Sequence, residues 1–578
     1  MDYLKAFYCG VLYLCSSHLL EAQEIGSGNK KSAFTLNGGF GASANFYTSN
    51  ETVATRPSFA WNTYGSFMAR TKEVELPFSF VINQYNNSHT SPYIQAGISP
   101  TYQWAKLHLG YRNMLFSPFT FEGQSFRGAG LELTPSQFRF AAFYGRLNKA
   151  VNEDTSSSSF RLPQYSRTGY GVKVGVGNSN RFFDLIYFHA KDDSSSASII
   201  NRSSRNALHA QENAVMGTSF KLTIAKKWIW TGDAAISGLV QDLSGKQSFD
   251  SSNETSRKFI KNFLPNNANV LANYAGQSSL TFVTTNFNGN LGYRRVQPGF
   301  KSFGTPYMTD DIELISFLSG FSIVNGKVNI STNLSQQHNN LNETLEAEMQ
   351  TQVGNLNVNA ILGQNFNLNL NFSGYNLKQR NDRNELPDSL RLPDSILLRQ
   401  RIAQYSLNPS YNITNGNNIH YISGNITLQT LKDKNPKTAP QTNSNNLSSS
   451  LTYTLALIKQ AYSFSFNYLY SRYKQEVNSY NSNGATVGAS AQLLKDKTLN
   501  MQGSFGLIFN RFNKNIRQRN MTYSASAGYR AKRHYFSLFA NYIYTPPNNA
   551  INDAINKTVP YAVASKNLNG GVSYNYNF

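Results

Sequence analysis

Cysteine is the scarcest chemically reactive residue in this sequence of 578 residues. Both cysteines, Cys9 and Cys15, lie within the first 22 residues. That stretch has the features of a secretory signal: Lys5 lies near its start, an apolar run follows, and Ala22 offers a small residue for cleavage. We therefore expect a mature chain without thiols, which excludes disulfides, cysteine-ligated metals and a cysteine nucleophile.

Long apolar runs are lacking too. No stretch approaches the roughly 20 apolar residues that a transmembrane helix needs, and the mean hydropathy is -0.42. A membrane-spanning chain without such helices must satisfy its backbone hydrogen bonds in a closed β-barrel. We see no linkers and no shifts in composition. The sequence therefore predicts a signal peptide at 1–22, a short periplasmic segment at 23–33 and one outer-membrane β-barrel at 34–578.

Motifs of enzymes and metal sites are also absent from the sequence. No HExxH or GxSxG occurs, and the histidines beyond the signal are scattered. His189 with Asp192 and Asp193 is the nearest approach to an acid–base group, but such residues near a rim are ordinarily solvated. The glycines of 169–177 share one parity and no helix pattern follows them, which favours a strand with a bare inner face over a phosphate loop. We predict no enzymatic activity, no cofactor and no metal.

Acidic residues are few, 32 against 53 basic ones, and the formal net charge is +21. An exported chain without a recognisable nucleic-acid module is not expected to bind nucleic acid. The basic residues concentrate in the expected turns and long loops. At the outer rim they would face lipopolysaccharide phosphates, which Lys and Arg bind well; plain solubilising charge is the alternative.

Alternation of apolar and polar residues is what the sequence has in abundance. In the final stretch, Asn567 to Phe578, one parity is apolar or aromatic and the other is rich in Asn and Ser, as in a strand with lipid on one side and water on the other. It resembles the terminal strand of bacterial outer-membrane barrels. That resemblance implies an assembly signal at Tyr574, Tyr576 and Phe578, read by the barrel assembly machinery.

The same alternation recurs along the whole chain in segments of the length of a tilted barrel strand. We count about 26 such segments, with about 24 as the alternative. Among them are 74–83, 93–104, 228–240 and 534–545. The connections alternate between tight turns and long loops, which is the asymmetry of short periplasmic turns and long extracellular loops. The predicted fold is an all-β, single closed antiparallel transmembrane barrel in the cell outer membrane.

The predicted lumen is hydrated and mostly neutral. Its parity is dominated by Asn, Ser, Thr, Gln and Gly, with occasional charges at Arg139, Lys173 and Arg294. Two long loops also contain apolar helix-like pieces, which we interpret as constriction or docking elements, with short helices shielding an outer loop as the alternative. Their apolar residues are Phe259, Ile260, Phe263, Leu264, Ile396, Leu397 and Leu398.

Three segments carry a resemblance to a known group of proteins: Phe126 to Leu133, Gln137 to Arg146 and Gly292 to Gly304. At these segments the chain resembles large outer-membrane β-barrel proteins of Bacteroidota-type bacteria, a family without an assigned function. The resemblance implies fold and location. It carries over no substrate and no catalytic residue.

Two functions follow from these expectations. The wet inner face favours a channel or transport-type pore for polar solutes, with its lumen restricted by the inward loops. Size favours the alternative, because barrels of 16 to 18 strands already hold an aqueous channel and 22-stranded transporters are plugged. In that alternative the barrel is a structural or accessory component of a secretion or assembly complex, and a periplasmic or surface protein fills it. A TonB-type transporter is disfavoured because 23–33 is too short for a plug.

Overall fold

The computed structural model describes residues 34–578, apart from ten short or medium segments. These segments are 51–56, 84–93, 154–162, 200–207, 245–257, 259–262, 265–269, 382–396, 514–515 and 548–563, with 1–33 before them. The expected signal peptide and the 23–33 segment lie outside the described residues. Among the described residues, no helix is long and apolar enough to cross a membrane.

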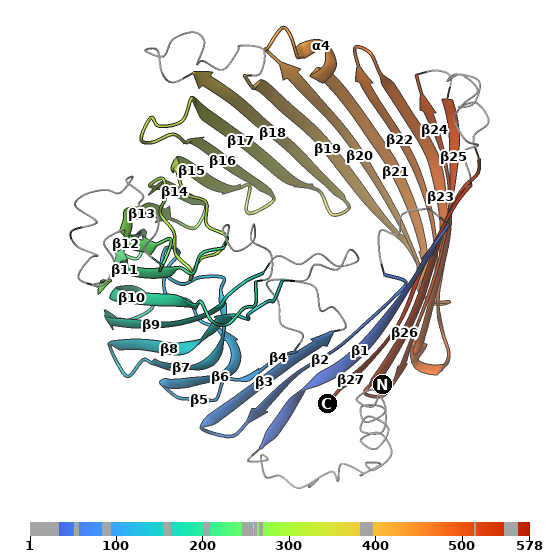
Figure 1. Cartoon of the computed structure of the whole chain (residues 1–578). Helices are drawn as coiled ribbons and strands as arrows, with labels where there is room; N and C mark the ends of the chain where they lie inside the picture. Colours follow the sequence, from blue (N-terminus) through green and yellow to red (C-terminus); the bar gives the residue numbers. More distant parts are fainter. Residues whose placement is uncertain are drawn as a thin grey trace.

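Almost all of the described chain is β-structure (Figure 1). The strands are β1 (Thr35–Ser49), β2 (Phe59–Arg70), β3 (Val74–Asn83), β4 (Ile94–Ile98), β5 (Thr101–Tyr102), β6 (Ala105–Asn113), β7 (Ser125–Leu133), β8 (Phe138–Asn148), β9 (Ser166–Gly177), β10 (Arg181–Asp193), β11 (Glu212–Ile224), β12 (Trp228–Val240), β13 (Val270–Val283), β14 (Phe287–Val296), β15 (Ile312–Ile323), β16 (Val328–His338), β17 (Ala347–Leu362), β18 (Phe366–Asn381), β19 (Arg399–Asn415), β20 (Asn418–Asp433), β21 (Ser444–Leu457), β22 (Tyr462–Gln475), β23 (Ser479–Leu493), β24 (Leu499–Phe512), β25 (Ile516–Ala531), β26 (His534–Thr545) and β27 (Ser565–Asn577). Two short helices, α4 (Ala439–Thr442) and the 3₁₀ turn η3 (Lys495–Lys497), lie between strands.

The strands form one closed antiparallel barrel. Each pairs with its neighbours in sequence, and β1 also pairs with β27, so the sheet has no free edge. β4 and β5 both lie between β3 and β6. The 27 strands therefore occupy 26 places, which confirms the predicted architecture.

Strand bounds were predictable where tight turns flank the strand. The predicted 74–83, 228–240 and 534–545 are the bounds of β3, β12 and β26. The predicted strand 93–104 is instead interrupted between β4 and β5, at Ser99-Pro100. Proline has no backbone N–H to donate to a ladder, so a break in pairing is expected there.

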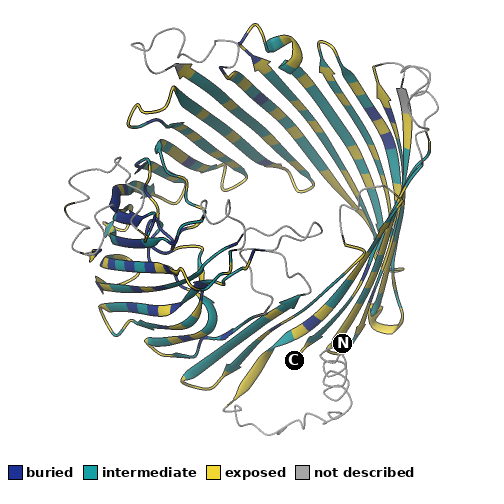
Figure 2. Ribbon diagram, in the orientation of Figure 1, coloured by how far each residue is buried: buried dark blue, intermediate teal, exposed yellow. Residues whose placement is uncertain are grey.

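The two faces of the wall differ in chemistry. On β10, Phe183 and Leu185 are 47 % and 56 % exposed, whereas Asp184 and Ile186 are buried. The face with exposed apolar side chains continues around the barrel and is the outer, lipid-type face. Figure 2 shows that buried positions gather on β7 to β14, while β16 to β27 are mostly intermediate or exposed. The inner face of one half of the barrel is therefore covered, and the cover is described below.

The closing pair, β1 with β27, is rich in aromatic contacts on the outer face. Phe40 lies 6.0 Å from Tyr574 and 5.6 Å from Tyr576 between ring centroids. Phe578 lies 5.4 Å from Phe67, and its backbone N–H donates to the Gly38 carbonyl over 2.9 Å. The three aromatic residues expected to form an assembly signal thus lie where the barrel closes, on its outer side.

Candidate functional site

The lumen has two unlike halves, and the first is the inner wall of β16 to β27. Strand register places Asn, Ser, Thr and Gln side chains next to one another there. Examples are Asn357 beside Asn371, Asn369 beside Asn408, and Asn467 beside Thr452. Among the described inward positions of β16 to β24, Asp433 at a strand end carries the only charge. A solute on this side meets a neutral, hydrogen-bonding surface.

Side-chain hydrogen bonds run across this wall as a ladder. Asn357 donates to Asn371, and Asn371 donates to Asn369 over 2.5 Å. Asn425 donates to Asn408, which in turn lies 3.4 Å from the Asn369 oxygen. The pattern continues with hydroxyl pairs: Ser406 with Thr427, Ser463 with Ser490, Ser504 with Ser524 and Ser537 with Ser573. Because amide and hydroxyl groups satisfy one another, the wall can face water without fixed charge.

The second half, the inner wall of β6 to β15, carries most of the charges of the lumen, and several of them form ion pairs. Arg139 binds Asp184 through two hydrogen bonds of 2.8 and 3.0 Å. Arg167 binds Asp192 in the same bidentate way, over 2.7 and 2.9 Å. Both carboxylates are nearly inaccessible, with side chains 2 % and 5 % exposed. Such buried pairs hold structure rather than offer free charge to a solute.

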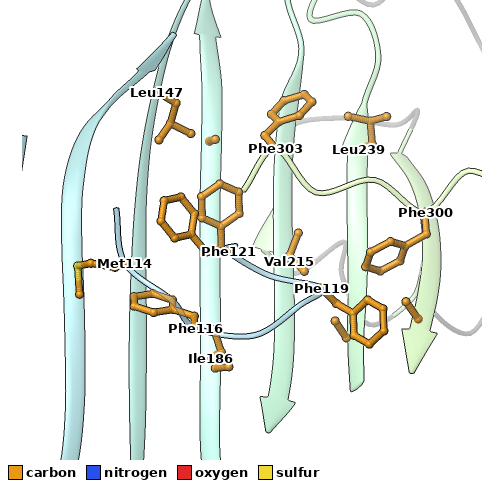
Figure 3. Packing of buried hydrophobic residues seen from close by; sticks show 14 of the residues in the cluster. Met114, Phe116, Phe119, Phe121, Leu147, Ile186, Val215, Leu239, Phe300 and Phe303 are labelled. Atoms are coloured by element: carbon orange, nitrogen blue, oxygen red, sulfur yellow. The ribbon is translucent and has the colours of Figure 1, made fainter. Parts of the chain in front are cut away.

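A layer of non-strand chain covers this second half from inside. The segment 114–124, between β6 and β7, lies across the strands with Met114, Phe116 and Phe119 pointing toward the wall (Figure 3). Phe119 and Phe121 are fully buried. Phe121 packs on Phe143 of β8 and Phe188 of β10, at 4.3 and 5.6 Å between ring centroids. We call 114–124 together with 297–311, which joins β14 to β15, the inward layer.

The second segment of the inward layer is fastened to the first and to the wall. Gly304 forms an isolated parallel bridge with Phe121, and the Glu122 N–H donates to the Gly304 carbonyl over 2.9 Å. Ser302 donates to the Thr120 carbonyl over 2.7 Å. Asn213, buried on β11, donates to the Lys301 carbonyl and accepts from the Phe303 N–H, over 2.9 and 3.0 Å. Two loops far apart in sequence thus form one unit.

Glycines make room for the inward layer. A Cβ on Gly171 would lie 2.7 Å from Phe116, and one on Gly217 would lie 2.6 Å from the Thr120 methyl group. Real Cβ atoms almost never approach so closely, so the bare inner face of β9 is the surface on which 114–124 rests.

The three lumen charges expected from sequence all lie on the inner face of this half. Arg139 pairs with Asp184 as described. The Lys173 ammonium donates to the Leu115 carbonyl over 3.1 Å, and the Arg294 guanidinium lies 5.1 Å from the Phe119 ring centroid, a distance typical of cation–π contacts. Lys173 and Arg294 therefore hold the inward layer to the wall.

Lys301 belongs to the inward layer itself. Burial lowers the pKa of its ammonium, and the neighbouring Arg167 lowers it further. The Arg167 guanidinium lies 3.4 Å from the Phe303 ring centroid, so the same arginine binds Asp192 and covers this segment. The inward layer and the wall are therefore electrostatically coupled at this point.

The expectation that the loop before β13 folds into the lumen is wrong for its described apolar residues. Leu264 is 2 % exposed and packs with Ala214, Val240 and Val270. These positions have the opposite parity to Val215 and Leu239, which the inward layer covers, so Leu264 lies against the outer face. Phe263 contacts Tyr187 on that same face. The spacing of the apolar residues correctly indicated that this loop has a buried side. It could not indicate whether that side packs on the inner or the outer face of the barrel.

The remaining residues expected in constriction or docking loops are placed only in part. Leu397 and Leu398 immediately precede β19, and the Gln379 N–H donates to the Leu398 carbonyl over 2.7 Å. Asn435 donates to the Leu397 carbonyl over 3.1 Å, so these two residues extend the β18–β19 hairpin. Phe259, Ile260 and Ile396 lie outside the described residues.

The inward layer was missed at the sequence level. A usable signal was present, because a loop with Phe116, Phe119 and Phe121 precedes strands whose inner parity carries glycine. Aromatic side chains in a loop and glycines on a strand face are complementary, which indicates packing between them. Which aromatic residue meets which glycine depends on the strand register of the barrel.

No protein-family model matches the chain, and no curated protein matches it either. Among solved structures, the P pilus usher (PapC) translocation pore aligns at 10 % identity with a TM-score of 0.35, covering 94 % of this chain and 99 % of that one. OpdQ of Pseudomonas aeruginosa aligns at 10 % identity with a TM-score of 0.33, covering 69 % and 98 %. The siderophore receptor PirA of the same organism aligns at 9 % with a TM-score of 0.34, covering 94 % and 80 %. Similarity at this level assigns no function.

Proposed function

We propose that this protein is an outer-membrane channel for polar solutes. Its barrel closes without a free edge, its outer face is apolar, and one half of its inner wall is neutral and polar. The short turns face the periplasm and the long loops face outward, as expected for an exported barrel.

The amide and hydroxyl wall of β16 to β24 is the observation that carries the proposal. Fixed charges inside a pore select ions by sign, because the field inside a low-dielectric wall is focused. A wall such as the Asn369, Asn408 and Asn425 ladder has dipoles without net charge. We therefore expect weak ion selectivity and passage of uncharged polar solutes along this side.

The inward layer narrows the lumen from the other side. It lies along the wall of β7 to β14, where Phe119 and Phe121 anchor it. The chain at Leu115 and Tyr307 remains exposed, at 62 % and 82 %. These side chains offer apolar contact opposite the neutral wall, which gives the pathway two chemically different sides.

A second function is favoured by strand number. Barrels of 16 to 18 strands already leave an aqueous channel, and this barrel has 26 places for strands. A complex component whose periplasmic or surface partner fills the lumen would explain the size. Purification in mild detergent with identification of co-eluting proteins distinguishes this function from a free channel.

The test of the channel is ion selectivity in planar bilayers. Intact protein should conduct with a weak preference for cation or anion. The double variant Asn369→Asp with Asn408→Asp adds two carboxylates to the middle of the neutral wall and should raise the cation preference several-fold.

The matched control is Asn417→Asp with Gln460→Asp, which adds the same charge in two short turns at the rim. Its reversal potential should move much less. If correctly folded, membrane-inserted protein gives no conductance steps, the channel proposal fails and the complex component is favoured.

A further inference from the structure

The outer face of β18 to β27 carries an unusual charge distribution at its long-loop end. Among the described residues of these strands, no Asp or Glu faces outward, the outward Lys and Arg lie toward the long-loop end, and the outward His420 and His534 lie toward the opposite end. We call this set the basic rim: Lys378, Arg380, Arg399, Arg401, Lys432, Arg472, Lys474, Arg511, Arg519 and Lys566.

The other half of the same rim is different. On β10 and β11, Glu212 accepts from His189 over 2.9 Å and lies 3.3 Å from Lys191. On β14 and β15, Glu313 pairs with Arg295 over 2.5 Å. Glu212 and Glu313 thus both pair with basic side chains of the same outer face. In the described part of the chain, no ion pair joins Arg472, Arg519 or Lys566 to an acidic side chain.

The basic rim is concave over β22 to β26. One hollow is lined by two guanidinium groups, four amides, two aromatic rings and two prolines: Arg511, Arg519, Asn481, Asn483, Asn510, Gln518, Tyr470, Phe509, Pro546 and Pro547. A second hollow beside it is lined by Lys566 and three tyrosines, Tyr523, Tyr542 and Tyr544. Tyrosine with basic residues is the composition of a membrane–water interface.

Below these hollows the same strands are apolar. Phe505, Val487 and Phe466 face outward and are 37 %, 50 % and 43 % exposed. Phe505 lies four residues from Phe509 along β24 and opposite Val487 of β23. A ligand with an anionic head and several acyl chains would therefore meet charge at the rim and hydrocarbon-like surface beneath it.

We propose that the basic rim of β22 to β27 binds a phosphorylated glycolipid of the outer leaflet. A guanidinium binds phosphate bidentately, and Arg511 and Arg519 lie on neighbouring strands at successive levels of the hollow. Asn481 and Asn483 offer amide groups for sugar hydroxyls. The proposal rests on the membrane location stated above, but not on solute conduction.

The test compares retained lipid between two variants purified in the same detergent from the same outer membranes. Arg511→Gln with Arg519→Gln should lose most of the bound lipopolysaccharide, measured by mass spectrometry of extracted lipid per barrel. Lys495→Gln with Lys497→Gln removes the same charge from an exposed short turn at the opposite rim and should retain lipid as the intact protein does.

A binding measurement separates the sources of phosphate. Added lipopolysaccharide should raise the unfolding temperature of delipidated protein, while its dephosphorylated form and inorganic phosphate at equal concentration should not. Equal lipid retention by both double variants overturns the proposal, as does equal protection by the dephosphorylated form or by inorganic phosphate alone. Heat modifiability and conductance of the same preparations show whether each variant folds, so a lost lipid site is distinguishable from a lost channel.

Discussion

Single glycines determine how closely the inward layer approaches the barrel wall. At Gly171 an added methyl group would meet Phe116 and Phe143, both at 2.7 Å. Both rings belong to the packed cluster that includes Phe121 and Phe188. Neither ring can move without disturbing others, because aromatic cores are close-packed. The absence of a side chain at Gly171 of β9 is thus required for the packing of the inward layer.

Gly171→Ala should therefore destabilise the protein. Overpacking of a filled core typically costs about 1 to 3 kcal/mol, so the urea midpoint should fall, and cleavage by protease within 114–124 should increase. Gly276→Ala is the control, since its methyl group would meet nothing closer than the Asp233 carbonyl at 3.7 Å. Equal midpoints for the two variants would show that the inward layer does not rest on the bare face of β9.

Buried ion pairs are the other residue-level support of this half. Asp184 and Asp192 are almost inaccessible, and each has a bidentate arginine. A carboxylate left unpaired in such a place costs about 3 to 5 kcal/mol. Arg139 and Arg167 are therefore structural residues of the wall, although they face the lumen.

At the scale of elements, the closing strands combine backbone pairing with an aromatic outer face. β27 pairs with β26 and β1 along nearly its whole length. Phe578 adds a backbone hydrogen bond to Gly38 and ring contacts with Phe67 and Tyr576. The apolar face of β27 therefore packs directly at the closing β1–β27 pair.

Phe578→Ala should reduce the amount of heat-modifiable barrel in outer-membrane fractions. The Phe578 ring packs across the closing β1–β27 pair against Phe67 of β2. The terminal strand also resembles that of outer-membrane barrels, which implies that its last aromatic residues are an assembly signal. Asn577→Ala, on the inward parity of the same strand, is the matched control and should assemble normally. Full assembly of the Phe578→Ala variant would remove the proposed role of this residue.

Strands were predictable and the inward segments were not, for one physical reason. Alternation along 228–240 or 534–545 reports lipid on one side and water on the other, which is a local property of each strand. The direction in which a loop folds depends on what lies across the barrel. Phe263 with Leu264 and Phe119 with Phe121 look alike in sequence, yet the first pair packs on the outer face and the second on the inner face.

The lumen charges show the same limit. Parity alone placed Arg139, Lys173 and Arg294 on the inner face. That Lys173 would bind the Leu115 carbonyl, or that Arg294 would lie over Phe119, could not be read from sequence. Both contacts require the loop 114–124, which joins the consecutive strands β6 and β7, to fold inward across strands that are distant from it in sequence.

For the whole molecule, function depends on how far the inward layer restricts a 26-place barrel. The layer covers β7 to β14 and leaves the neutral wall of β16 to β24 exposed to the lumen in the described chain. Phe119 and Phe121 anchor the inward layer by apolar packing. Replacing a buried phenylalanine with alanine typically lowers the free energy of unfolding by about 3 to 5 kcal/mol. Loss of both anchors should release the layer without opening the strand ladders.

Phe119→Ser with Phe121→Ser should therefore change the single-channel conductance and increase its noise in planar bilayers, because the released segments no longer lie flat against the wall and can move within the lumen. Phe263→Ser with Leu264→Ser removes two apolar residues from the outer face and should leave the conductance unchanged, which separates lumen effects from general destabilisation. If intact protein already conducts as a wide pore and neither variant changes it, the inward layer does not limit the pathway. A barrel of this size would then need another protein to close it, and the complex component would replace the channel as the favoured function.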